Sequence, residues 1–301
     1  MGISQYLKEI GRGKQGARAL TREQAADLFG QVLDGGLSDL EVGAFCIAMR
    51  VKGETPEEMC GFLDATGARL RKLKSAGGQP VAVLPSYNGA RRLPVLTPLL
   101  AGLLARRGLP VLIHGTATES SRVFVHEVLH ALDIPAAGEP PELHAGQVAF
   151  VPTEVLSPGL KRLLDARRLI GLRNSGHSLV KLMNPCAGRA VIVGSYTHPE
   201  YAVSMAAVFE RMKATALLLR GTEGEVVADA RRLPQMDGFV RGERVTLQEG
   251  RKGTLAQLPD LPGTVDADST ASYIREVLAG HKPIPESLAL QVEHILHLSN
   301  A

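Results

Sequence analysis

Apolar residues in the first seventy positions recur every three or four residues, the spacing that places them on one face of an α-helix. Each of three such segments begins with Ser or Thr followed three residues later by Glu or Gln, the pair that forms a capping box: Thr21–Gln24, Ser38–Glu41 and Thr55–Glu58. Gly35 and Gly53 stand where the first two segments should end. The pattern therefore predicts three helices, with a shorter helix before Gly11.

A different pattern follows the basic, glycine-rich stretch ARLRKLKSAGGQP (68–80), which we interpret as a linker. Short apolar runs typical of buried strands occur at 81–84, 110–113, 147–151, 190–193, 216–219 and 225–228. Helical patterns lie between them at about 95–107, 122–133, 157–169 and 199–211, and a last helix is expected in PESLALQVEHILHL (285–298). This alternation predicts a mostly parallel sheet that is covered by helices on both faces.

The two patterns predict an α/β protein with two domains. The first is a small all-helical domain over residues 1–75, and the second is a larger, mostly parallel α/β domain over residues 76–301. The helical stripes contain more large apolar residues than three short helices are expected to bury: Leu28, Phe29, Phe45 and Met49. We therefore expect the helical domain to join two copies of the chain into a homodimer.

Composition limits the class of protein. The chain has 301 residues, of which 45% are hydrophobic, enough for one large domain or two unequal ones. Its longest apolar stretch, LPVLTPLLAGLLA (93–105), is too short to span a bilayer, and no signal-peptide core precedes it. The three cysteines, Cys46, Cys60 and Cys186, form no C-x-x-C pair and are typical of reduced thiols. These features predict a cytoplasmic protein without a membrane partner.

Charge is distributed unevenly along a chain whose formal net charge is only +3. Residues 85–115 carry four arginines and no acid, and residues 155–195 carry seven cations and one acid. These segments sum to +4 + 6 = +10, so the remainder carries 3 − 10 = −7. Such asymmetry is typical of a basic face or groove that binds a polyanion. The alternative is that these cations are ordinary solvated helix ends, as Arg106 and Arg107 would be.

Two segments resemble the anthranilate phosphoribosyltransferase family, also called glycosyltransferase family 3. AMRVKGETPEEM (48–59) is similar to the N-terminal signature of that family. GLRNSGHSLVKLMNP (171–185) is similar to its G-x-R-T-x-x-N-x-x-x-P-L-x-N-P segment, with these residues in register: Gly171, Arg173, Leu182, Asn184 and Pro185. The resemblance covers essentially the whole chain. It implies a helical domain and an α/β domain of the nucleoside phosphorylase/phosphoribosyltransferase type.

The stretches where that family binds phosphoribosyl pyrophosphate depart from its pattern. PSYNGAR (85–91) stands in place of the glycine loop G-T-G-G-D, and Ile113-His114-Gly115-Thr116 stands in place of K-H-G-N. The Asp-Glu magnesium pair of the enzymes falls near GTEGE (221–225), where Gly224 separates two glutamates. Because the pyrophosphate leaving group must be neutralised by metal and hydrogen-bond donors, we expect no catalytic residues, no metal and no cofactor here.

This combination resembles the YbiB-type branch of the family, which keeps the dimeric scaffold and binds nucleic acids without clear sequence preference. With the charge pattern, it predicts a non-enzymatic homodimer that binds DNA or RNA through basic grooves. The predicted nucleic-acid-binding residues are Arg91, Arg92, Arg167, Arg168, Arg173 and Lys181. A relic phosphate site is predicted at Ser86, Asn88, Gly89, His114 and Gly115. The alternative function is a glycosyl- or phosphoribosyltransferase for a phosphorylated sugar or nucleotide, because such substrates are also polyanions.

Overall fold

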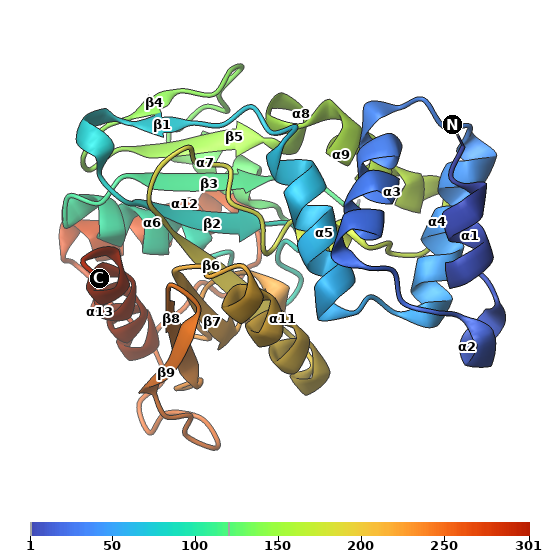
Figure 1. Ribbon diagram of the computed structural model, residues 1–301. Coiled ribbons are helices and arrows are strands. Elements are labelled where there is room, and N and C mark those ends of the chain that lie inside the picture. The colour runs from blue at the N-terminus through green and yellow to red at the C-terminus, as the bar shows by residue number, and fades with distance from the viewer. Residues whose placement is uncertain (1, 120) are drawn as a thin grey trace. The chain divides into compact units, whose positions relative to one another are not determined.

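The computed structural model describes residues 2–119 and 121–301 (Figure 1). The chain divides into two compact units. The first, called the helical unit below, contains Met1–Arg71 and Thr153–Pro185, and the second, the α/β unit, contains Lys72–Pro152 and Cys186–Ala301. The first boundary lies close to the predicted linker. The assignment of residues 153–185 to the α/β domain is wrong, because this segment returns to the helical unit.

The helical unit is built from short helices, all of which except α10 are labelled in Figure 1. They are α1 (Ser4–Ile10), α2 (Gly13–Gly16), α3 (Arg22–Asp34), α4 (Asp39–Lys52), α5 (Pro56–Gly67), α8 (Thr153–Leu156), α9 (Pro158–Ile170) and α10 (Gly176–Leu179). All three predicted capping boxes are present, and the hydroxyls of Thr21, Ser38 and Thr55 accept hydrogen bonds from backbone N–H groups three residues on. Local sequence thus sets where α3, α4 and α5 begin.

Three phenylalanines form the centre of the helical unit. Phe29 stacks on Phe62 with ring centroids 4.6 Å apart, and Phe45 meets both rings edge-on at 6.1 Å. Leu28 and Met49, like these rings, are fully buried. The expectation that these stripes form a dimer surface is therefore wrong, because the unit buries them within one chain.

Helix α9, which the sequence pattern assigned to the α/β domain, covers part of this core. It packs against α3 at Gly159, where an added Cβ would lie 2.0 Å from the carbonyl oxygen of Leu33. Only glycine allows the two backbones to approach so closely. Leu160, Leu163 and Leu164 of α9 are buried. The returning segment therefore completes a core that α3, α4 and α5 alone would leave open.

The α/β unit contains a seven-stranded sheet in the order β5-β3-β2-β6-β7-β8-β9 and a two-stranded sheet of β1 and β4. The strands are β1 (Lys74–Ser75), β2 (Val81–Ser86), β3 (Val111–Gly115), β4 (Glu142–Leu143), β5 (Val148–Pro152), β6 (Ala190–Tyr196), β7 (Ala216–Arg220), β8 (Met236–Val240) and β9 (Glu243–Gln248). The helices are α6 (Thr97–Arg106), α7 (Val125–Ala131), α11 (Pro199–Arg211), α12 (Ala267–Ala279) and α13 (Glu286–Ser299), with short 3-10 turns η1 (Ala76–Gly78) and η2 (Thr222–Gly224). The predicted mostly parallel α/β architecture is confirmed.

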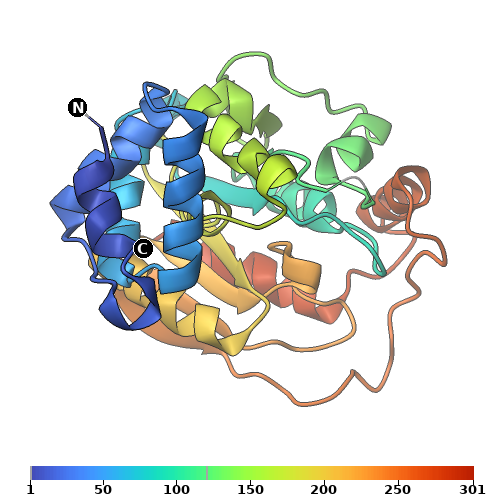
Figure 2. The same ribbon diagram turned by 90° about the vertical axis from the view of Figure 1, so that its right-hand side faces the viewer.

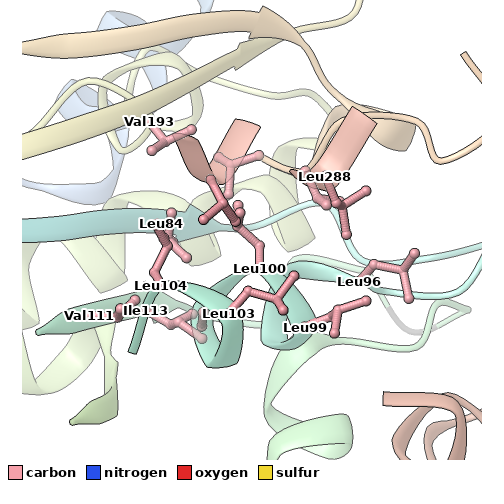
Figure 3. Close-up of a cluster of buried hydrophobic side chains, with 14 of the residues drawn as sticks. Leu84, Leu96, Leu99, Leu100, Leu103, Leu104, Val111, Ile113, Val193 and Leu288 are labelled. Carbon is pink, nitrogen blue, oxygen red and sulfur yellow. The ribbon is translucent and has the colours of Figure 1, made fainter. Parts of the chain in front are cut away.

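Helices α6 and α13 pack against one face of the large sheet and α11 packs against β6 and β7. Figure 3 shows Leu99, Leu100 and Leu103 of α6 gathered with Leu84 of β2 and Ile113 of β3. All of these side chains are buried, and they belong to one continuous core. The close-packed, buried strands β2 and β3 therefore hold the loops that follow them.

Three features of the α/β unit differ from the sequence-based prediction. Residues 225–228 form no strand of the sheet, and only Ala228 makes an isolated bridge, with Gly221. Strands β8 and β9, which are antiparallel, and helix α12 were not predicted. Between β9 and α12, residues 249–266 run as an extended loop (Figure 2).

No helix among the described residues is long and apolar enough to cross a membrane.

Candidate functional site

The order of the parallel strands marks one position in the α/β unit as a ligand site. The chain winds from β2 through β3 to β5 in one direction, and it continues from β6 to β7 in the other. Strands β2 and β6 are neighbours, with Val83 opposite Ile192. Open α/β sheets bind ligands outside the carboxyl ends of their strands at such a reversal. The loop after β2, residues 86–93, therefore lies where a ligand is expected.

The inner half of this loop surrounds a carboxylate of the chain itself. The backbone N–H groups of Asn88 and Gly89 donate to Oε1 of Glu225 at 2.8 and 2.9 Å. The hydroxyl of Ser86 donates to Oε2, and that of Thr97 does so at 3.3 Å. Glu225 is only 2% exposed. Four donors converging on one buried anion form an anion-binding site, and Glu225 fills it.

The outer half of the loop binds a second carboxylate in a similar way. Oε2 of Glu223 accepts hydrogen bonds from three successive backbone N–H groups: Arg91 at 2.8 Å, Arg92 at 3.1 Å and Leu93 at 3.4 Å. Glu223 is only partly buried, and the side chains of Arg91 and Arg92 are exposed. We call these three N–H groups the outer amide triad. Its occupant lies at the protein surface, whereas Glu225 does not.

Glu223 lies in the turn η2, and Glu225 directly follows it. Glu223 has φ +52° and Gly224 has φ +90°, so two successive residues adopt the left-handed region. The side-chain amide of Asn88 donates to the carbonyl oxygen of Glu223 at 3.0 Å, and the hydroxyl of Ser195 donates to that of Gly224 at 2.9 Å. These contacts hold a left-handed conformation that glutamate otherwise disfavours.

The predicted relic phosphate site is brought together around Glu225 only in part. Ser86, Asn88 and Gly89 contact its carboxylate, as described above. His114 instead lies wholly inside the protein, where its Nδ1 is 2.8 Å from the hydroxyl of Tyr87. Burial lowers the pKa of His114 to about 3, so its imidazole is neutral at pH 7. Gly115 allows β3 to approach β2, because a Cβ there would lie 1.9 Å from the carbonyl oxygen of Ser86.

The residues present do not fit a magnesium–pyrophosphate group. The donors that would face a phosphate after β2 are occupied by Glu225, and the carboxylates that would face a metal are turned toward amides. Among residues 2–119 and 121–301, no group of three or more His, Cys, Asp or Glu side chains is placed to hold a metal ion. The altered spacing of these glutamates is visible in the sequence, whereas their role as internal ligands appears only in the structure.

The predicted nucleic-acid-binding residues fall into both units. Arg91 and Arg92 follow β2 in the α/β unit, and no acidic side chain of the described chain forms an ion pair with either. Arg167 and Arg168 lie in the last turn of α9 in the helical unit. The Arg168 side chain is 66% exposed and 3.7 Å from Asp165. Arg173 and Lys181, also in the helical unit, are partly buried. That all six line a shared basic surface stays a prediction.

The sequence of the chain is similar to those of known proteins over most of its length. Residues 4–67 match a family described as the glycosyl transferase family, helical bundle domain. The chain is 40% identical over 303 residues to the uncharacterized protein YbiB of Escherichia coli, covering 97% of this chain and 92% of YbiB. It is 26% identical to anthranilate phosphoribosyltransferase of Methanopyrus kandleri, covering 92% of this chain and 84% of the enzyme.

Solved structures show the same fold. Anthranilate phosphoribosyltransferase of Thermus thermophilus aligns with a TM-score of 0.77 at 22% identity, over 98% of this chain and 89% of that one. The Saccharomyces cerevisiae enzyme in complex with PRPP and Mg aligns with a TM-score of 0.67 at 12% identity, over 99% and 86% of the two chains. These likenesses support a phosphoribosyltransferase fold. They lend no support to nucleic-acid binding.

Proposed function

The chain belongs to the family of YbiB, within the anthranilate phosphoribosyltransferase superfamily, and from this premise we propose that it is a nucleic-acid-binding protein that has lost phosphoribosyl transfer. The observation that carries the proposal is the carboxylate of Glu225 on the amides of Asn88 and Gly89. A pyrophosphate could use these donors only by displacing a buried side chain. It would also meet the negative charge of Glu223 at the mouth of the loop.

The loss of one electrostatic element would slow phosphoribosyl transfer, whereas the loss of several together removes it. The transition state needs donors aimed at the leaving pyrophosphate and a metal that bridges its oxygens. In this chain the donors serve internal carboxylates. Ile113 also stands where the family lysine is expected, and its side chain is fully buried. Binding without transfer is the function that this arrangement supports.

Nucleic acid is the proposed ligand because exposed cations remain on the loop after β2, where the side chains of Arg91 and Arg92 are exposed. In the helical unit, the last turn of α9 carries two more cations, Arg167 and Arg168. Phosphate contacts of this kind give affinity without sequence selectivity. The charge asymmetry of the sequence, +10 in two segments of a chain with net +3, supports the same ligand.

We also propose that two copies of the chain associate through α4. With the central stripes buried, the exposed apolar side chains of the helical unit include Leu40 at 84%, Ile47 at 41% and Val51 at 56%. Their spacing of seven and four residues places them on one side of α4. Substitution of Leu40 and Val51 by aspartate is expected to halve the mass measured by light scattering. A parent that is already monomeric at micromolar concentration would refute the proposal.

The main test is binding of generic oligonucleotides as salt is varied. With four to six phosphate contacts we expect log K to fall against log salt with a slope of about −3 to −5. The variant Arg167→Ala/Arg168→Ala should weaken all sequences equally and make the slope shallower, while a matched melting curve confirms that it is folded. A parent that binds neither single nor double strands, of DNA or RNA, at low salt would overturn the proposal.

The second candidate function is a glycosyl- or phosphoribosyltransferase with an altered ligand set. The comparisons favour it, because relatives that cover most of the chain are named anthranilate phosphoribosyltransferase. The test is turnover of phosphoribosyl pyrophosphate with magnesium and anthranilate or another acceptor. Product formation clearly above background, abolished by a change at Ser86 or Asn88, would establish this function in place of the first.

A further inference from the structure

We propose that the outer amide triad is a phosphate-binding site, and that Glu223 is a displaceable internal occupant which closes it. The N–H groups of Arg91, Arg92 and Leu93 converge on one carboxylate oxygen within 2.8 to 3.4 Å. Successive backbone N–H groups that point to one place bind anionic oxygens, including those of phosphate. The triad shares no donor with the subsite that Glu225 fills, because Glu225 accepts from the amides of Asn88 and Gly89.

The two glutamates of this turn differ in how easily each can leave. Glu225 is 2% exposed and has four donors, two of them buried hydroxyls of Ser86 and Thr97. Glu223 is partly exposed, and within the described part of the chain its carboxylate accepts from three backbone amides, those of Arg91, Arg92 and Leu93. Water can hydrogen-bond those amides when Glu223 swings out, which is not possible for the buried donors around Glu225. Glu223 is therefore the occupant that a ligand can replace.

The backbone favours such an exchange as well. Glu223 adopts φ +52°, a conformation that is uncommon for a residue with a Cβ. Strain of this kind persists where surrounding contacts hold it and is concentrated at ligand clamps and switches. Part of what keeps Glu223 left-handed is its own carboxylate on the triad. Displacement of that carboxylate removes this constraint.

A phosphate also gains contacts that Glu223 does not use. The exposed side chains of Arg91 and Arg92 begin at the same residues whose amides form the triad. A phosphate oxygen on the amides would leave its other oxygens to these guanidinium groups, which bind phosphate with two parallel hydrogen bonds. Within the described residues, the carboxylate of Glu223 is hydrogen-bonded to the backbone of Arg91 and Arg92 and not to their side chains, so the triad is better matched to phosphate than to its present occupant.

The inference rests on the proposed function only for the source of the phosphate. The shared chemistry is a phosphate group, which can come from free inorganic phosphate, from the end of a nucleic-acid strand or from its internal phosphodiesters. Each source can be presented separately to the full-length protein, so failure of the site and failure of nucleic-acid binding are distinguishable.

The experiment compares the parent with Glu223→Ala and Glu223→Gln by calorimetry, using inorganic phosphate as the probe. Removal of an occupant that is bound most of the time should tighten phosphate binding at least about tenfold, because apparent affinity scales with the fraction of open sites. Adding Arg91→Ala/Arg92→Ala to Glu223→Ala should reverse the gain. Glu200→Ala is the control, since it removes the same charge from an exposed position of α11.

Oligonucleotides with a 5′-phosphate or a 5′-hydroxyl then identify the source. A gain in Glu223→Ala for the phosphorylated strand alone assigns the triad to strand ends, and an equal gain for both assigns it to internal phosphodiesters. If inorganic phosphate binds tightly but no oligonucleotide does, the site stands and the proposed function falls. The inference is overturned if folded Glu223→Ala and Glu223→Gln bind phosphate no better than the parent, or if Glu200→Ala gains as much.

Discussion

Each unit of the molecule contains one deeply buried glutamate, and the two are satisfied in different ways. In the helical unit, Glu58 is fully buried and lies 2.6 Å from the ammonium group of Lys52, which is 8% exposed. It also accepts from the amides of Leu20 and Thr55 at 2.9 Å each. In the α/β unit, Glu225 has amide and hydroxyl donors, and no cationic side chain of the described chain forms an ion pair with it.

The difference separates a structural ion pair from an occupied binding site. A buried carboxylate beside a lysine is neutralised locally, and the pair contributes to holding α4 and α5 together. A buried carboxylate held by dipoles alone is bound in the way that proteins bind phosphate and sulfate. The α/β unit therefore contains an anion-binding site that is filled by a carboxylate of its own chain.

The largest expected effect comes from breaking the ion pair. Glu58→Ala should lower the free energy of unfolding by roughly 3–5 kcal/mol, because it leaves the buried ammonium group of Lys52 without a counter-charge. Urea denaturation measures this loss. Lys52→Met combined with Glu58→Gln should recover much of it, since no buried charge then remains. If Glu58→Ala lowers the free energy of unfolding by less than about 1 kcal/mol, the ion pair does not hold α4 and α5 together.

Glu225→Ala should cost slightly less, about 3 kcal/mol, because it leaves buried N–H and O–H donors without an acceptor. An added anion should distinguish this variant from Glu58→Ala. Inorganic phosphate at about ten times its dissociation constant should restore roughly 1.4 kcal/mol to this variant by mass action. The same phosphate should leave Glu58→Ala unchanged. Equal rescue of both variants, or of neither, would remove the distinction between the two glutamates.

A third buried titratable group, His114, predicts how the α/β unit responds to acid. Its pKa is about 3 in the folded protein, whereas a histidine in the unfolded chain has the ordinary value of 6.5. Between pH 6.5 and about pH 3 the unfolded state therefore binds more protons than the folded state. The stability that the neutral imidazole contributes is lost as the pH falls through this range. At pH 5.5 the loss is about 1.4 kcal/mol relative to neutral pH.

Substitution of His114 tests whether its imidazole causes this loss of stability at low pH. His114→Gln should show a shallower fall in stability between pH 7.5 and 5.5 than the parent, whatever its stability at neutral pH. Denaturation midpoints at several pH values give the two slopes. Parallel slopes would mean that His114 takes up its proton in the folded state at ordinary pH, and would contradict its burial beside Tyr87.

The smallest effect on stability is expected at the surface of the same loop. Arg91→Ala/Arg92→Ala should leave the melting temperature unchanged within error, because both side chains are exposed. The slope of log K against log salt should nevertheless become shallower by about 1.4 to 1.8, if each arginine neutralises one phosphate. An unchanged slope would place the binding surface elsewhere, with α9 as the next position to test.

Local signals explain which parts of the fold were predictable. The starts of α3, α4 and α5 follow from capping boxes that span four residues, and five parallel strands follow from short apolar runs. The return of α9 to the helical unit had no local signal, because it depends on the contact of Gly159 with Leu33. Strand β9 was missed because most of its residues are exposed and polar, so it lacks an apolar run.

The candidate site was predictable in position but not in content. The loop after β2 could be located from the strand before it and from the family resemblance. The hydrogen bonds to Glu225 join residues more than 120 positions apart, so no local pattern reveals them. The altered spacing of Glu223 and Glu225 was visible in the sequence and was interpreted as loss of a metal pair. The structure adds that each carboxylate has acquired amide partners.

The interrupted course of the helical unit has a consequence for how the protein is made. The unit is assembled from residues up to Arg71 and from Thr153–Pro185, so 153 − 71 = 82 positions separate its two pieces. Helix α9 ends 170 − 34 = 136 positions after α3. At synthesis rates of about 5–20 residues per second, α3 therefore emerges from the ribosome roughly 7–27 s before α9, which packs against it. During that interval the phenylalanine cluster lacks its full cover. The nascent chain is thus most exposed to aggregation, and most dependent on chaperones, before residue 153 has been translated.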